Sequence, residues 1–176
     1  MGLPLVVSEY RERKILKRFK VTPISPVMLL TVEFLIYVIY SVISLATIIP
    51  VAMMFWKVEI HGSWIAFVGS WLLTTVSTLS IGMMVGGIAQ NAKTASVIAC
   101  ILYFPMLIFS GATLPFEVMP KGMQTVVQFF PITQGIQLMK STFLGTPLSN
   151  AWLPVFVMLA ITIICSGVAI KCFKWE

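Results

Sequence analysis

The chain has 176 residues, of which 59% are hydrophobic and only 10% are charged, and its net charge is +6. A soluble domain carries about 25% charged residues, so this composition excludes an ordinary soluble protein and indicates an all-α, polytopic integral membrane protein. The excess positive charge then has phospholipid headgroups or an acidic protein as its partner, and nucleic-acid binding is not expected.

The first predicted element is a short amphipathic helix over residues 8–22 that lies along the inner surface of the membrane. Ser8 is placed to cap its start, and Glu9 pairs with Arg13 one turn later. Six basic residues fall within positions 11–20, directly before a charge-poor run. This asymmetry is typical of the cytoplasmic side of a membrane protein.

The stretch RERKILKRFKVTPIS resembles the cytoplasmic connection between the second and third membrane helices of type-2 ATP-binding-cassette exporter permeases. In that family this connection includes a coupling helix that docks in a groove on a separate ATPase subunit. The resemblance implies an ATPase-coupling role for the matching positions, which are Glu12, Arg13, Leu16, Arg18, Phe19, Thr22 and Pro23. The residues alone also allow a polybasic helix resting on anionic lipid, in which each basic residue contributes about 1 kcal/mol.

Four apolar stretches are long enough to cross a membrane as helices, which takes about 20 residues. They are residues 27–55, 63–87, 94–113 and 151–170. Glu33 lies near the inner edge of the first span, where we interpret it as an anchor that reaches water or a nearby basic residue, rather than as a proton relay. Pro50 predicts a kink or an early end in this span, and Pro105 predicts a kink in the third.

The second span carries a small residue at every fourth position. These residues lie on one slowly drifting stripe of a helix, where small side chains allow another backbone to approach closely. The stripe is therefore a predicted helix-packing face, although its partner cannot be identified from the sequence. Its members are Ser70, Thr74, Thr78, Gly82 and Gly86.

Residues 114–149 form a predicted outer segment that does not cross the membrane. Prolines and glycines divide it into pieces of about ten residues, which are too short to span, so short re-entrant or interfacial helices are expected over 123–130 and 133–143. The stretch from residue 110 to 131 also resembles the outer segment after the fifth helix of the same permease family. The matching residues are Ser110, Gly111, Pro115, Met119, Pro120 and Pro131.

Nine of the 12 Lys and Arg residues fall on the predicted inner side, so both termini are expected in the cytoplasm. The two resemblances together cover nearly the whole chain and imply a single permease domain over residues 1–176 in a bacterial or archaeal cell membrane. They imply outward transport of a drug, lipid or similar amphipathic substrate, with a separate ATPase and a second permease chain. The family has two further spans ahead of the coupling segment, so the chain corresponds to the C-terminal two thirds of such a permease.

The sequence predicts no enzymatic activity of its own. It has no Asp and no GxxxxGK[ST] phosphate loop, so ATP is expected to be bound by the partner subunit, with no cofactor on this chain. Cys100, Cys165 and Cys172 lie in or directly after apolar runs and are interpreted as packing residues rather than metal ligands. The alternative function is a small ATPase-independent membrane protein, a pore-former or assembly factor, whose basic helix binds lipid.

Overall fold

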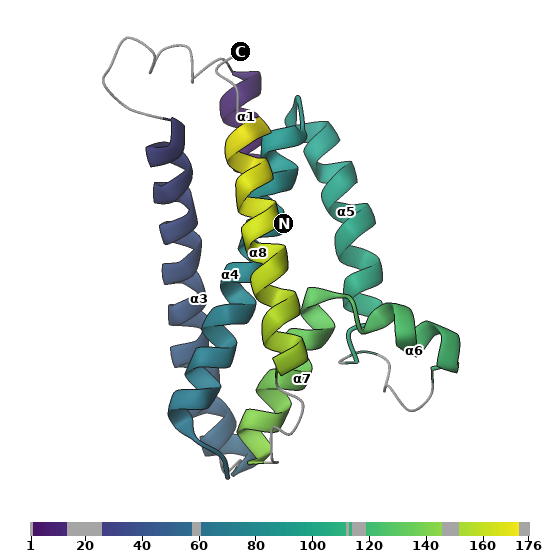
Figure 1. The fold of residues 1–176 in the computed structure, drawn as a ribbon. Helices are drawn as coiled ribbons and strands as arrows, with labels where there is room; N and C mark the ends of the chain where they lie inside the picture. The colour runs from purple at the N-terminus through teal and green to yellow at the C-terminus, as the bar shows by residue number, and fades with distance from the viewer. Residues whose placement is uncertain are drawn as a thin grey trace.

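The computed structural model describes residues 2–13, 26–57, 61–111, 113, 119–145 and 152–172, and every element within these ranges is a helix (Figure 1). The predicted all-α fold class is confirmed. The elements are α1 (Gly2–Glu12), α3 (Pro26–Trp56), α4 (Trp64–Ile88), α5 (Ala92–Ile108), α6 (Lys121–Val127), α7 (Pro131–Leu144) and α8 (Trp152–Cys172).

Within the described residues, α3, α4 and α8 are long and apolar enough to cross a membrane. The helix α5 is apolar too, but its 17 residues reach only about 25 Å, slightly less than a hydrocarbon core of ~30 Å. The helix α3 continues through Pro50 to Trp56, so the early end predicted at this proline is wrong. Membrane helices tolerate proline because local adjustments and neighbouring groups satisfy the backbone that it leaves unpaired.

The central helix of the bundle is α4, which packs against α8, α7 and α1. Toward α8, the Ser77 hydroxyl donates to the Met158 carbonyl at 3.4 Å, and the Ser166 hydroxyl lies 3.3 Å from that of Ser80. In lipid, apolar burial does little to drive helices together, so close packing and hydrogen bonds of this kind supply the contact. Ser77 and Ser80 lie outside the predicted small-residue stripe.

The N-terminal half of the predicted stripe on α4, with Ser70 and Thr74, faces α7. The hydroxyl oxygens of Ser70 and Thr142 are 3.2 Å apart. A Cβ added to Gly135 of α7 would lie 2.3 Å from the Thr74 methyl carbon, a distance that real Cβ atoms essentially never show. The glycine at 135 is therefore what allows α7 to lie against α4.

The C-terminal half of the same stripe, with Gly82 and Gly86, faces α1. A Cβ added to Gly86 would lie 2.9 Å from the Cβ of Val7, and one added to Gly82 would lie 3.4 Å from Pro4. Thr78, between the two halves, lines a cavity described below. The drift of a four-residue spacing around a 3.6-residue helix explains why one row meets two different elements.

The predicted outer segment contains the two short helices α6 and α7, which have seven and 14 residues and are both too short to span. The Gln134 side-chain amide donates to the Gln128 carbonyl and links the end of α6 to the start of α7. At its other end α7 meets the start of α4, where the Gly62 N–H donates to the Phe143 carbonyl at 3.2 Å. Re-entry of these helices into the membrane stays a prediction.

The helix α1 begins at Gly2, six residues earlier than predicted, and Ser8 does not cap it. Ser8 occupies an interior position of the helix and is fully buried. Its hydroxyl donates to the carbonyls of Pro4 at 2.8 Å and Leu5 at 3.0 Å. A hydroxyl that bonds back to the preceding turn in this way is typical of a serine in a helix interior. Residues 14–22 of the predicted helix lie outside the described residues.

Candidate functional site

The helix α1 is inserted between other helices. Leu3 and Val7 are 2% and 1% exposed and form an apolar cluster with Leu30 of α3. On its other sides α1 packs against α4 and α5. The apolar face of α1 therefore contacts protein. The predicted surface helix over residues 8–22 stays a prediction, because residues 14–22 lie outside the described part of the chain.

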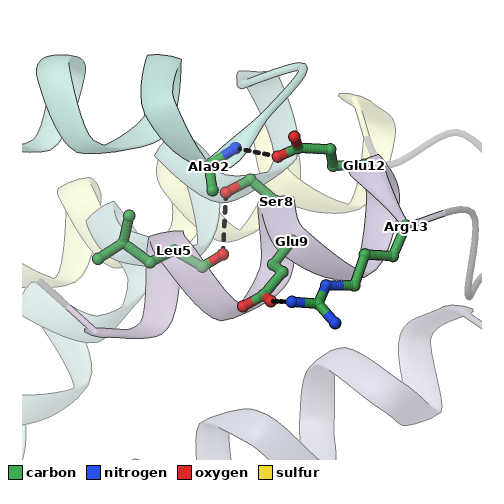
Figure 2. Close-up of polar contacts among 6 residues, drawn as sticks. All are labelled: Leu5, Ser8, Glu9, Glu12, Arg13 and Ala92. Atoms are coloured by element: carbon green, nitrogen blue, oxygen red, sulfur yellow. Dashed lines mark hydrogen bonds and ion pairs between the residues drawn. The ribbon is translucent and has the colours of Figure 1, made fainter.

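The last turn of α1 contacts the turn that joins α4 to α5. Nη1 of Arg11 donates to the carbonyls of Gly87 at 3.2 Å and Ala89 at 3.5 Å. Oε2 of Glu12 accepts from the Ala92 backbone N–H at 3.0 Å, as Figure 2 shows. Arg11 thus meets the carbonyl end of one helix and Glu12 the amide end of the next, and each charge has the sign that the helix dipole favours.

The start of α5 has a cap of its own. The Asn91 side chain accepts from the Thr94 N–H at 2.7 Å, which satisfies one of the first unpaired amides. Because the cap already stabilises this helix, and because Glu12 is exposed, the contact from Glu12 adds modestly to stability. Its main effect is to fix where α1 lies relative to α5.

Tyr10 joins α1 to the first long helix. Its hydroxyl donates to Oε1 of Glu33 at 2.7 Å. This hydrogen bond to a carboxylate, together with burial, raises the pKa of Tyr10 to about 12. Glu33 was expected to anchor the inner end of its helix through water or a basic residue, and a tyrosine hydroxyl of α1 is the partner found.

The structure describes two of the seven predicted coupling residues. Glu12 contacts Ala92, and Arg13 forms the predicted i,i+4 ion pair with Glu9 at 2.6 Å (Figure 2). The other five, Leu16, Arg18, Phe19, Thr22 and Pro23, lie outside the described residues. The sequence did not indicate the parts played by Arg11 and Tyr10, because their partners are backbone carbonyls and a distant carboxylate.

The predicted outer motif starts where α5 ends. Ser110 is buried, and its hydroxyl donates to the Leu107 carbonyl at 2.8 Å. Gly111 has φ +83°, a left-handed conformation that glycine adopts without strain, so the Ser-Gly pair turns the chain out of the helix. Of the prolines, Pro120 precedes α6 and Pro131 occupies the first turn of α7.

Two motif residues remain. Met119 is buried, with 7% exposed, and Pro115 lies outside the described residues.

An apolar cavity of about 300 Å³ lies between α1, α4 and α5, and Ile132 at the start of α7 also lines it. Its lining has no ionised side chain, and the polar groups it includes are hydroxyls such as those of Thr78 and Tyr103. Within the described ranges, no three His, Cys, Asp or Glu residues gather where they could hold a metal ion. Among the described residues, the candidate functional feature is therefore the contact surface at the end of α1, together with the helix packing that positions it.

Comparison with known proteins identifies the family. The family model described as "ABC-2 family transporter protein" matches residues 1–171. The inner membrane transport permease YhhJ of Escherichia coli is 24% identical over 156 residues, which cover 86% of this chain and 41% of YhhJ. Nodulation protein J of Rhizobium leguminosarum bv. viciae is 30% identical over 86 residues, which cover 49% of this chain and 33% of that protein.

The chain spans less than half the length of these relatives, and no solved structure matches it. The family match nevertheless extends over nearly every residue, from α1 into the last turn of α8. The chain belongs to the ABC-2 family of membrane transporter proteins.

Proposed function

We propose that this chain works as a permease subunit of an exporter, driven by a separate cytoplasmic ATPase that docks on the segment after α1. The supporting observation is where the charges lie. Arg11 and Arg13 at the end of α1, Lys93 at the start of α5 and Lys171 at the end of α8 all belong to one end of the bundle (Figure 1). Basic residues collect at the cytoplasmic end of membrane proteins, where a soluble ATPase would be found.

The contacts of α1 also favour a docking segment over a lipid-bound helix. Its apolar residues Leu3 and Val7 are buried against protein, so α1 has little apolar surface left for lipid. The end of α1, from which the basic segment continues in the sequence, lies beside the α4–α5 turn because Glu12 contacts Ala92 there.

A second permease chain and an amphipathic cargo complete the proposal. Both follow from the family resemblance. With most of the relatives' length outside this chain, the residues that select the cargo are not assigned.

The test is association with an ATPase subunit. When the chain is purified with an ATPase encoded beside it, Leu16→Glu or Phe19→Glu is expected to lower the recovered ATPase at least tenfold, because a carboxylate enters an apolar contact. Glu9→Gln is the control. Glu9 lies in α1, the helix directly before this segment, and its replacement should leave recovery unchanged. Equal recovery with all variants, or membrane release without any bound ATPase, would contradict the proposal and favour the lipid-bound alternative.

A further inference from the structure

The turn between α4 and α5 is held from both sides by neighbouring residues of α1. Arg11 binds carbonyls at the end of α4, and Glu12 binds the first amide of α5. Exchanging the two charges would place each against a helix end of the same sign. The order Arg-Glu is therefore matched to the order in which the two helices end and begin.

The position of α5 depends mainly on α1. Its contacts with α1 exceed those with α4 or α7, and its buried residues Ala95 and Ala99 are small enough for close approach. The helix α5 stands apart from α8 (Figure 1), and Ile101 is 66% exposed. Because α5 packs mainly against α1, a displacement of α1 is expected to move α5 with it.

We infer that Arg11 and Glu12 are positioning residues that make α1, the adjoining end of α4 and all of α5 move as one body. The inference rests on the proposed function, since it concerns how a push on the ATPase-docking segment enters the membrane. The segment follows α1 directly, so a displacement imposed on it reaches Arg11 and Glu12 first. Their contacts then transmit it to the α4–α5 turn.

The experiment compares α5 before and after ATP turnover in the complex of the full chain with its ATPase in lipid nanodiscs. Spin labels are placed at Ile101→Cys on α5 and Ile163→Cys on α8, both on exposed side chains, after the three native cysteines are replaced. The distance between the labels is measured without nucleotide and after trapping with ATP and vanadate. Trapping is expected to shift this distance in the otherwise unchanged chain.

The decisive variant is the exchange Arg11→Glu with Glu12→Arg, which keeps the net charge of α1. The distance is measured only in complexes of this variant that contain bound ATPase, and there we expect it to lose at least half of the shift. Glu12→Gln should lose a smaller part, which keeps the test valid should the exchange impair folding. The conservative pair Arg11→Lys with Glu12→Asp should recover most of the shift, and Glu9→Gln should keep all of it.

Different results would overturn the positioning role and the proposed function. If the ATPase binds and the exchange variant shows the full shift, or if α5 does not move even in the unchanged chain, the positioning role is wrong and the proposed function stands. If the unchanged chain binds no ATPase, the proposed function is wrong and the positioning role falls with it.

Discussion

Gly86→Leu is expected to displace α1 from the bundle and to destabilise the protein by about 1–3 kcal/mol, the usual cost of overpacking a close contact. Even a Cβ at this position would lie 2.9 Å from the Cβ of Val7 and 3.3 Å from the Cα of Pro4, so neither neighbour can give way by rotating a side chain. Thermal unfolding in detergent measures the loss of stability. Faster hydrogen exchange of the α1 amides would show that this helix has moved.

Gly69→Leu is the matched control, because Gly69 lies on the same helix and has no atom within 4 Å of an added Cβ. It adds the same apolar side chain and the same gain in helix propensity without the clash. Its unfolding midpoint should equal or exceed that of the parent. If both variants melt alike and α1 exchanges slowly in both, the close approach of α1 to α4 is wrong.

Gly135→Leu is expected to separate α7 from α4 and to lower stability by a similar amount, about 1–3 kcal/mol. A Cβ there would lie 2.3, 2.7 and 3.1 Å from three atoms of Thr74, so rotating the threonine only exchanges one clash for another. The Thr74 hydroxyl also donates to the Ser70 carbonyl at 2.7 Å, which resists that rotation. The measurement is again the unfolding midpoint in detergent.

Gly167→Leu on α8 serves as the control for the second variant, since an added Cβ there has no neighbour within 4 Å. It should unfold at the temperature of the parent. A Gly135→Leu protein as stable as this control would mean that the outer segment does not pack on α4 as described.

The long helices were predictable because each depends on local composition. An apolar run of about 20 residues commits the backbone to a helix in lipid whatever its neighbours are. The spacing of small residues on α4 likewise identified the side chains that permit close packing. It could not identify their partners, because Gly135 and Val7 approach from far away in the chain and carry no matching pattern.

The limits of α1 were not predictable from capping signals. Ser8 resembles a cap in the sequence, yet the helix extends upstream of it because Leu3 and Val7 gain burial against α3 and α4. Tertiary packing outweighed a capping preference of about 1 kcal/mol. The partners of Arg11 and Glu12 are backbone groups, which every residue possesses, so no side-chain pattern marks them.

The central claim is that a cytoplasmic ATPase docks on the segment after α1. Its most direct test is the labelling of one cysteine placed just after α1, which reports the side of the membrane and protection by the ATPase. With the three native cysteines replaced and Lys14→Cys introduced, a membrane-impermeant maleimide should label the chain in inside-out vesicles and leave it unlabelled in right-side-out vesicles. Added ATPase subunit should slow that labelling at least several-fold. Labelling from the outer side, or a rate that the ATPase leaves unchanged, would contradict a cytoplasmic docking segment.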